Sequence, residues 1–464
     1  MKTTLRMTGQ QLLQLLNHLY PGDGNEAVAV ALCGRRAGSE NHVLMIQQIY
    51  MVPYEHCPIR NPVRVEWSTD ILLPVVAKAA KENLALVKFH SHPTGSRNFS
   101  DLDNVSDREL MESVYGWTNT DQPHASVIML PTGEMFGRTI SIDGQFAPID
   151  LITVVGDDLR FWYRDIAIQA PDPISLRTEQ AFGKGTTNLL KRLSIAVVGC
   201  SGTGSLVIEQ LARLQVGRLV LIDPDHIELK NLTRITNSFS LDAKEERFKV
   251  DVLARAINDM GLGVTALPIA KNLLEPDVIK LVAECDILFG CMDGVEGRHY
   301  LNLISSFYSL PYFDLGVRLD SDGQGGVTQV CGTVHYLQPG GSSLLTRQVY
   351  TLEQLRAEGL KRTSPEIYNE QRKFKYIQGV NEDRPAVISV NMLIASLAVN
   401  ELLARLHSFR TQDNSGFAAV RVSLSDSFLF YERDGDPDFS LAKNAGRGDI
   451  IPLLNRSELS QEGQ

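Results

Sequence analysis

The residues best suited to chemistry lie in one short stretch, KFHSHPTGSRNFSDLD, at positions 88–103. His90 and His92 stand two residues apart, and Ser100 and Asp103 follow at fixed spacing. If the apolar run before them is a strand, both imidazoles point to the same side, since strand side chains repeat every second residue. Two histidines and one carboxylate leave a tetrahedral Zn²⁺ with one open position for water, which is the arrangement of a catalytic site.

This spacing resembles that of the JAMM (MPN+) metalloproteases, which cut isopeptide or peptide bonds at the C-terminus of ubiquitin-like proteins. The resemblance implies Zn²⁺ on His90, His92 and Asp103, with Ser100 hydrogen-bonding the developing oxyanion. It also implies a general base upstream, and Glu26, at the head of an apolar run, occupies that place. A carboxylate beside a metal-bound water is well placed to shuttle its proton.

The elements that must position these residues follow from hydrophobic periodicity and from Gly and Pro breakers. We expect helices at residues 8–19, 70–83 and 107–114, and strands at 27–32, 43–52, 84–89, 125–130 and 134–142. This order fits the layered α/β sheet of the JAMM family, and the resemblance covers residues 8–142.

A second set of residues begins at the loop Gly199-Cys-Ser-Gly-Thr-Gly, which contains Gly199, Gly202 and Gly204. The loop joins an expected strand at 193–198 to an expected helix at 205–214, and a further strand follows at 218–223. Such a β-loop-α-β unit binds phosphates on loop amides at a helix N-terminus. Ser201 replaces a glycine of the dinucleotide fingerprint, which disfavours a nicotinamide oxidoreductase.

Downstream of this loop stand Asp223, Asn231, Arg234, Lys249 and Asp293. This set resembles the ThiF/MoeB and ubiquitin-activating family, which adenylates the C-terminal glycine of ubiquitin-like proteins or sulfur carriers. The resemblance, from about residue 177 to 406, implies that Asp223 holds the ATP ribose and that Asn231, Arg234 and Lys249 contact the phosphates. It implies Mg²⁺ on Asp293. Such cations offset the repulsion between an attacking carboxylate and a triphosphate.

Two further residues complete the expected adenylation site. Arg177 occupies the place of the family's N-terminal arginine, which reaches a dimer-related site, so the resemblance implies a homodimer through the adenylation domain. Many family members form a thioester, but no cysteine follows Cys331. Two outcomes stay open: direct transfer to a partner's nucleophile, or an oxyester on a hydroxyl, for which Ser364 is our candidate.

Composition limits the class of protein. The chain has 464 residues, 43% of them apolar and 22% charged, which is typical of a soluble globular protein with two large domains. The net charge of −10 argues against nucleic-acid binding. Six cysteines without a C-x-x-C pair predict a reducing, cytoplasmic location. We find no signal peptide and no apolar run near the roughly 18 residues that span a bilayer, so we expect no membrane contact.

We therefore predict an α/β chain with a JAMM-type sheet domain (1–160), a Rossmann-like doubly wound adenylation domain (161–442) and a C-terminal tail (443–464). The favoured hypothesis is a bifunctional enzyme that uses Zn²⁺ to process or deconjugate a ubiquitin-like protein. With ATP and Mg²⁺ it would also adenylate that protein's C-terminus, assisted by a conjugating-enzyme-like partner. The alternatives are sulfur-carrier activation and release, and a binding scaffold with inactive heads.

Overall fold

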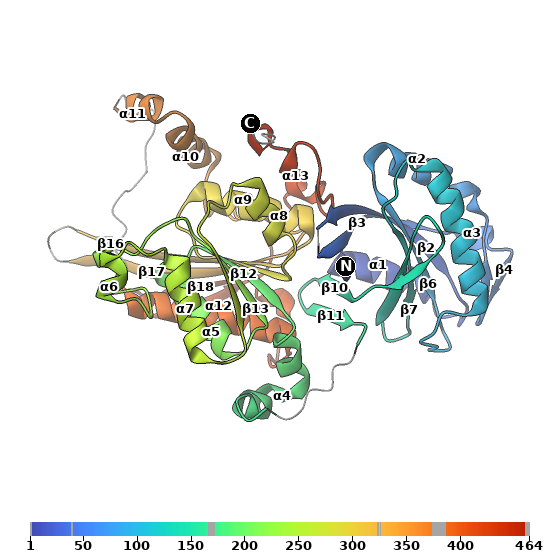
Figure 1. The fold of residues 1–464 in the computed structure, drawn as a ribbon, viewed down its shortest axis with the longest axis horizontal. Coiled ribbons are helices and arrows are strands. Elements are labelled where there is room, and N and C mark those ends of the chain that lie inside the picture. The colour runs from blue at the N-terminus through green and yellow to red at the C-terminus, as the bar shows by residue number, and fades with distance from the viewer. Residues whose placement is uncertain are drawn as a thin grey trace. The chain divides into compact units, whose positions relative to one another are not determined.

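The computed structural model describes residues 2–38, 40–165, 172–322, 324, 326–373 and 387–459. The chain folds into two compact units, each built on its own large sheet (Figure 1). Unit 1 comprises Met1–Ala167, Phe307–Ser309 and Asn444–Asn455. Unit 2 comprises Ile168–Ser306, Leu310–Lys443 and Arg456–Gln464.

Unit 1 contains a nine-stranded mixed sheet in the order β11-β10-β1-β3-β2-β6-β7-β8-β9. The segment between β3 and β6 forms a separate two-stranded hairpin, β4 and β5. The strands are β1 (Lys2–Thr8), β2 (Val28–Ala37), β3 (Asn41–Met51), β4 (Ile59–Asn61), β5 (Arg64–Glu66), β6 (Ala85–Ser91), β7 (His124–Met129), β8 (Met135–Ile140), β9 (Phe146–Pro148), β10 (Leu151–Val155) and β11 (Leu159–Tyr163).

Helices cover both faces of this sheet. The strand β2 shows why: its alternate residues enter two separate cores, Ala29 and Ala31 in one, Val30 and Leu32 in the other. Helix α1 (Gly9–Leu19) packs on the first core, and helices α2 (Leu73–Glu82) and α3 (Asp101–Trp117) pack on the second (Figure 1). A strand covered on both faces is a continuous apolar run, as this sequence has.

Unit 2 contains an eight-stranded sheet in the order β14-β13-β12-β15-β16-β17-β18-β19. The strands from β14 to β16 in that order pair in parallel, and the rest pair antiparallel. The strands are β12 (Ser194–Val198), β13 (Arg218–Ile222), β14 (Thr265–Ile269), β15 (Ile287–Gly290), β16 (Tyr312–Ser321), β17 (Val327–Leu337), β18 (Ala419–Ser423) and β19 (Phe428–Glu432).

The parallel part of this sheet is doubly wound. Figure 1 shows α8 and α9 on one face and α5, α7 and α12 on the other. The strand order reverses beside β12, and ligands of such folds bind outside the carboxyl ends of the strands at that point. The helices are α4 (Leu176–Leu190), α5 (Gly202–Arg213), α6 (Ser240–Lys244), α7 (Lys249–Met260), α8 (Pro276–Val282), α9 (Val295–Tyr308), α10 (Leu352–Thr363), α11 (Pro365–Lys373), α12 (Ile388–Leu406) and α13 (Phe439–Ala442).

One helix among the described residues, α12, is long and apolar enough to cross a membrane by length and composition. The expectation that no apolar run approaches that length is therefore wrong. However, 61% of its most apolar window is buried inside the structure, and α12 packs on α5. This is the burial of a core helix in a globular domain.

Local structure departs from the sequence expectations at three places. Helix α3 begins at Asp101 rather than near residue 107, because Ser100 caps it. Residues 2–8 and 151–163 add the strands β1, β10 and β11 to the sheet, where we expected no strands. In the segment expected as a tail, the Gly446 carbonyl accepts a hydrogen bond from the Gly34 amide within unit 1.

Candidate metal centre and nucleotide site

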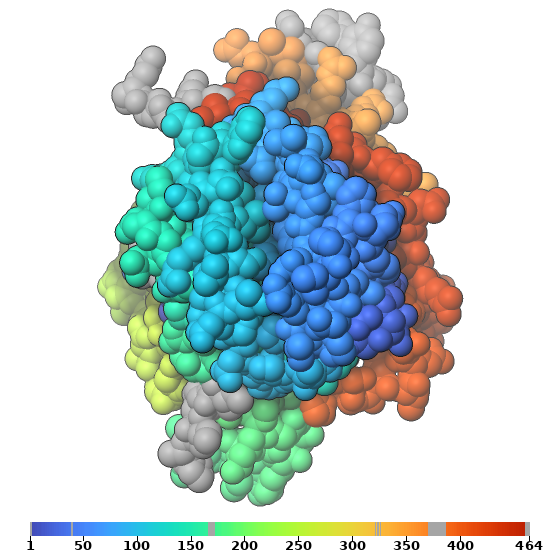
Figure 2. Space-filling view, turned by 90° about the vertical axis from the view of Figure 1, so that its right-hand side faces the viewer, coloured from blue at the N-terminus to red at the C-terminus, as the bar shows by residue number. Residues whose placement is uncertain are grey.

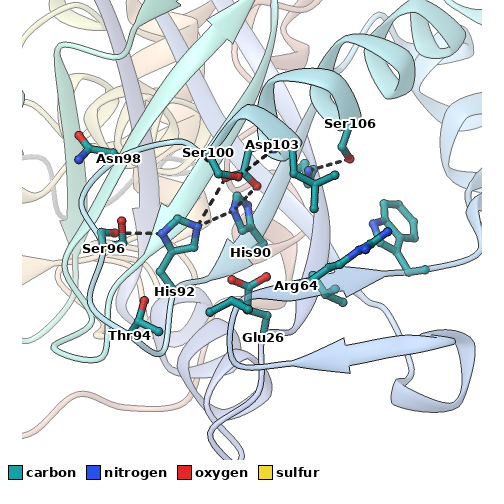
Figure 3. A pocket seen from close by; sticks show the side chains of 15 residues that line it. Glu26, Arg64, His90, His92, Thr94, Ser96, Asn98, Ser100, Asp103 and Ser106 are labelled. Atoms are coloured by element: carbon teal, nitrogen blue, oxygen red, sulfur yellow. Dashed lines mark hydrogen bonds and ion pairs between the residues drawn. The ribbon is translucent and has the colours of Figure 1, made fainter.

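The metal-centre candidates are brought together by one strand and one helix N-terminus. His90 lies on β6 and His92 follows its end, while Asp103 lies in the first turn of α3. Ser100 is the N-cap of α3: its hydroxyl accepts a hydrogen bond from the Asp103 amide (3.1 Å). The Asp103 carboxylate accepts in return from the Ser100 amide and hydroxyl, both at 2.7 Å. This capping box holds Asp103 toward the histidines (Figure 3).

The ligand atoms converge at distances that suit a tetrahedral cation. His90 Nε2 lies 3.1 Å from His92 Nε2 and 3.1 Å from Asp103 Oδ1, and His92 Nε2 lies 3.8 Å from Asp103 Oδ2. Ligands about 2.0–2.1 Å from a tetrahedral Zn²⁺ stand about 3.3 Å apart. The donor set and its spacing therefore fit a Zn²⁺ ion with an open coordination position.

The pKa values of the two histidines shift in opposite directions, and that of His92 is raised because Asp103 and the Ser96 carbonyl outweigh its burial. His92 Nδ1 lies 2.9 Å from the Ser96 carbonyl, so the Nδ1 proton is donated there and the Nε2 lone pair faces the centre. Burial lowers the pKa of His90, which favours its neutral form. The pKa of Asp103 is lowered despite its burial, because the carboxylate lies beside both imidazoles and accepts a hydrogen bond from the Ser100 hydroxyl.

Glu26 lines the same cavity of about 240 Å³ as these residues. Its carboxylate points toward the imidazoles (Figure 3). Its backbone amide donates to the Asn61 carbonyl of β4, which fixes the start of β2 beside the hairpin. Burial raises the pKa of Glu26 to about 7. A carboxyl with a pKa near neutrality can both accept and return a proton, as a general base must.

The glycine loop of unit 2 has no room for side chains. A Cβ on Gly204 would lie 1.8 Å from the Gly199 carbonyl oxygen, and one on Gly199 would lie 2.7 Å from the Cys291 carbonyl oxygen. Gly199 also has a φ of +92°, which disfavours other residues. A Cβ on Gly202 would meet the Asn391 side chain at 2.4 Å. The loop therefore presents backbone atoms without side chains between the end of β12 and the start of α5.

Charged residues collect at the carboxyl ends of the neighbouring strands. Asp223 follows β13, and its carboxylate accepts from the Cys200 amide at 2.7 Å. Lys249, at the start of α7, lies 3.6 Å from Asp223 and donates to Asp225 at 2.7 Å. Burial raises the pKa of Asp223, although Lys249 opposes that rise. The buried carboxylate of Asp223 and the buried ammonium of Lys249 therefore lie side by side next to the glycine loop.

A cavity of about 510 Å³ unites most of the expected nucleotide residues. Its lining includes the expected residues Gly199, Asp223, Asn231, Arg234, Lys249 and Asp293. The side-chain oxygen of Asn231 accepts a hydrogen bond from the Glu228 backbone amide at 3.0 Å. This leaves the side-chain NH₂ group of Asn231 for the cavity. Gly202 and Gly204 lie behind this lining, in the first turn of α5.

Besides Gly202 and Gly204, Arg177 and Ser364 do not line this cavity. Arg177 lies near the start of α4, where its guanidinium donates to Gln180 at 3.2 Å. Ser364 is the C-cap residue of α10, where its backbone amide donates to the Leu360 carbonyl. Three other hydroxyls in the segment before α12 donate hydrogen bonds: Ser342 to Asp434, Ser343 to Asp438 and Thr363 to the Gly359 carbonyl.

Sequence reasoning did not find several residues of the two cavities. Arg64 and Trp67, from the β5 hairpin and the turn after it, line the metal cavity. Glu358 and Arg362 of α10 line the nucleotide cavity. The hairpin and α10 lie far from the motifs in sequence and carry no spacing signal of their own. They are recognised only because the fold places them in the same cavities as the motif residues.

Both units match known families, and the chain belongs to the ThiF family. The ThiF family model matches residues 175–430, which is more than half of the chain. A second model, described as prokaryotic homologs of the JAB domain, matches residues 10–140. The chain is therefore a fusion of a JAB/MPN-type unit and a ThiF-type, Rossmann-like adenylation unit.

Similar proteins match only parts of the chain. Ubiquitin-like modifier-activating enzyme 5 of Aedes aegypti is 26% identical over 166 residues, which cover 33% of this chain and 39% of that protein. Adenylyltransferase and sulfurtransferase MOCS3 of Danio rerio is 33% identical over 113 residues, 24% of each. This chain thus spans less than half the length of these relatives. A crystal structure of E. coli MccB with ATP has a TM-score of 0.44 and 18% identity, covering 59% of this chain and 75% of that one.

Proposed function

We propose that this chain is a bifunctional enzyme that acts on the C-terminus of a ubiquitin-like protein. One unit would cleave the peptide or isopeptide bond after that C-terminus with Zn²⁺, and the other would adenylate the freed carboxylate with ATP and Mg²⁺. The observation that carries the proposal is the convergence of His90, His92 and Asp103 beside Glu26 in a chain whose other unit belongs to an adenylating family.

In the peptidase unit, the described side chains divide the work. His90, His92 and Asp103 would hold Zn²⁺, which as a Lewis acid lowers the pKa of a bound water toward about 7. Glu26 takes the proton of the attacking water and returns it to the leaving amine. The Ser100 hydroxyl lines the same cavity, and its proton would serve the oxyanion by turning from Asp103 to the substrate.

In the adenylation unit, the chemistry consists of positioning and charge compensation. A carboxylate oxygen of the substrate attacks the α-phosphorus of ATP, the α–β phosphoanhydride bond breaks, and pyrophosphate leaves. Arg234 and Lys249 offset the negative charge that gathers in this step. Asp223 would bind the ribose hydroxyls, and Asp293 would hold Mg²⁺, which would supply positive charge to offset the negative charge of the phosphates.

The apolar groove along α3 supports a protein substrate rather than a small one. It has a volume of about 650 Å³ and is continuous with the metal cavity, since Val65, Trp67, Leu102 and Ser106 line both. Figure 2 shows the face of unit 1 that carries it, between α2 and the cyan α3. Val105 and Trp117, exposed by 51% and 62%, lie along it. Exposed apolar surface of this kind suits contact with a folded partner.

Two assays test the proposal with the cognate ubiquitin-like protein as substrate. Labelled pyrophosphate should exchange into ATP only when the native C-terminus is free, because the adenylate forms there. A C-terminally extended substrate should be cleaved in the presence of Zn²⁺. If ATP binds but native enzyme and substrate give no exchange, the adenylation half of the proposal is wrong. Mass spectrometry of the exchange mixture would show whether an oxyester forms on Ser364.

A second candidate function, activation and release of a sulfur carrier, is favoured by the similarity to an adenylyltransferase and sulfurtransferase. The two functions share both chemical steps and differ in the final acceptor. Adding a persulfide donor and a thiol reductant distinguishes them: in a sulfur carrier the persulfide displaces AMP and the thiol then reduces the S–S bond to leave a C-terminal thiocarboxylate, whereas a modifier is transferred to a conjugating-enzyme-like partner. We also propose a cytoplasmic homodimer in which Arg177 reaches the partner's nucleotide, testable by mixing Arg177→Ala with Lys249→Ala protein.

A further inference from the structure

A buried ionic cluster adjoins the candidate metal centre, and its Lys88 also lines the metal cavity. Lys88, Asp107 and Arg138 have side chains exposed by 5%, 0% and 9%. Lys88 Nζ donates to Asp107 Oδ1 at 2.7 Å, and Arg138 donates to Asp107 Oδ2 through Nη2 at 2.7 Å and Nε at 3.2 Å. Both carboxylate oxygens of Asp107 are therefore occupied. Burying three charged groups costs free energy, so a function for them is worth seeking.

The cluster joins the two elements that carry the metal ligands. Lys88 and His90 lie two residues apart on β6, so their side chains share one face of the sheet. Asp107 lies four residues after Asp103 on α3, one turn farther along the same side of the helix. The Lys88–Asp107 pair therefore links the same strand and helix as the His90–Asp103 pair. It lies two residues away on β6 and one turn away on α3. It sets the distance between strand and helix.

Arg138 extends the cluster to the loop before α3. Its guanidinium is stacked between two aromatic rings, with Cζ 3.7 Å from the centroid of Phe99 and 3.8 Å from that of Phe146. It also donates to the Asn104 side chain. Phe99 in turn contacts the imidazole of His90, with ring centroids 6.4 Å apart. Arg138 therefore fixes both the start of α3 and the loop that leads to Ser100.

We propose that Lys88, Asp107 and Arg138 are positioning residues that hold Asp103 at ligand distance from the two histidines. The inference rests on the zinc site of the proposed function. In the first turn of α3 the capping box orients the carboxylate, but it does not tie the helix to β6. The buried cluster supplies that tie. Groups behind metal ligands typically change metal affinity by about 10–100-fold when they are removed.

The variant Lys88→Met separates positioning from simple electrostatics. Lys88 is a cation close to the site, so its loss would strengthen Zn²⁺ binding if only its charge mattered. Positioning predicts the opposite, a fall in Zn²⁺ affinity of about 10–100-fold, measured by competition with a chromogenic chelator. Lys88→Arg, which keeps the donor, should recover most of that loss. Lys81→Met, an exposed lysine of α2, should bind Zn²⁺ like the native protein.

Co²⁺ substitution gives a readout that a purely structural role would not move. The visible bands of Co²⁺ report the coordination geometry of folded protein, and Lys88→Met should shift or weaken them. Arg138→Met leaves the Lys88–Asp107 pair in place and serves if Lys88→Met does not fold. It should lower Zn²⁺ affinity by several-fold and also alter the Co²⁺ bands.

The outcomes separate this inference from the proposed function. If the native protein binds no Zn²⁺, or if His92→Ala leaves binding unchanged, the zinc site itself is wrong. If native protein binds Zn²⁺ and His92→Ala abolishes binding, the site stands. In that case, the positioning role is overturned if Lys88→Met protein binds Zn²⁺ as tightly as the native protein or more tightly. It is also overturned if folded Arg138→Met protein keeps the native Zn²⁺ affinity and the native Co²⁺ bands.

Discussion

At the scale of single residues, Glu26 has the environment of a proton shuttle. Burial raises its pKa to about 7 before any cation is bound, and a nearby dication lowers it. We predict that Glu26→Gln lowers the kcat of cleavage by about 10²–10⁴-fold while Zn²⁺ binding is retained. Glu112→Gln, an exposed residue of α3, is the matched control. Retained cleavage in zinc-loaded Glu26→Gln protein would exclude Glu26 as the base.

The same carboxyl predicts a pH dependence. A general base acts only when deprotonated, so kcat/KM should rise with pH through the pKa of the free enzyme and then level off. The bound cation places that midpoint below about 7, the value without it. A pH–rate profile measures it. A profile whose acid limb is unchanged in Glu26→Gln protein would assign that limb to another group.

In the nucleotide site, Lys249 is buried and pairs with Asp223 and Asp225. We predict that Lys249→Ala lowers the rate of ATP–pyrophosphate exchange by at least about 10²-fold, because a cation is lost where phosphate charge develops. Arg213→Ala, which removes an exposed arginine paired with Glu209, should leave the exchange rate within about twofold. An equal effect of both changes would contradict the assignment of Lys249.

Residue spacing predicted the ligand set because it encodes geometry. In H-x-H, period two alone places both imidazoles on one side, and S-x-x-D at a helix start aims the carboxylate. Lys88 begins the stretch 88–103 and Asp107 lies four residues after its end, but their pairing depends on how α3 docks on β6. That docking is tertiary, so no local pattern revealed it. The hairpin carbonyl of Asn61 beside Glu26 was hidden for the same reason.

At the scale of elements, the glycine loop depends on close backbone approach. We predict that Gly204→Ala destabilises unit 2 by about 1–3 kcal/mol and weakens ATP binding, because its Cβ would lie 1.8 Å from the Gly199 carbonyl oxygen. Gly185→Ala, in α4, meets nothing within 4 Å and should not destabilise the protein. Thermal unfolding with and without ATP measures both effects. Native stability of Gly204→Ala would refute the packing argument.

The groove beside α3 makes a second prediction at this scale. Trp117 lies at the end of α3 opposite to the metal ligands and is 62% exposed. If the groove binds the substrate, Trp117→Ala should raise the KM of cleavage on the order of tenfold with little change in Zn²⁺ affinity. Leu13→Ala changes an exposed apolar residue of α1 that does not line the groove. The same KM for both variants would place the substrate elsewhere.

The type of each element was predictable wherever the hydrophobic periodicity was clear. The residues at which the elements begin and end were not predictable. Helix α3 was expected to begin near residue 107, because its first turn, DLDN, is polar and solvent-exposed apart from the capping box. The strand β1 was missed since KTTLRMT alternates weakly and is stabilised by β3 and β10 on its two sides. Pairing partners far away in sequence decide such strands.

At the scale of the whole molecule, the two chemistries should be separable by metal. A zinc-selective chelator in excess Mg²⁺ should abolish cleavage and leave ATP–pyrophosphate exchange unchanged, since the nucleotide cavity is lined by none of the proposed zinc ligands. Adding Zn²⁺ back should restore cleavage. Loss of exchange together with cleavage would show that the two activities depend on a common metal.

The central claim is that both units act in turn on one ubiquitin-like substrate, and one measurement tests it directly. Labelled pyrophosphate exchange is followed with a C-terminally extended substrate and with the mature one. Native enzyme should support exchange with both, because it first removes the extension. Glu26→Gln enzyme should support exchange with the mature substrate only. Exchange by Glu26→Gln enzyme with the extended substrate at the native rate, or no exchange by native enzyme with either substrate, would contradict the account.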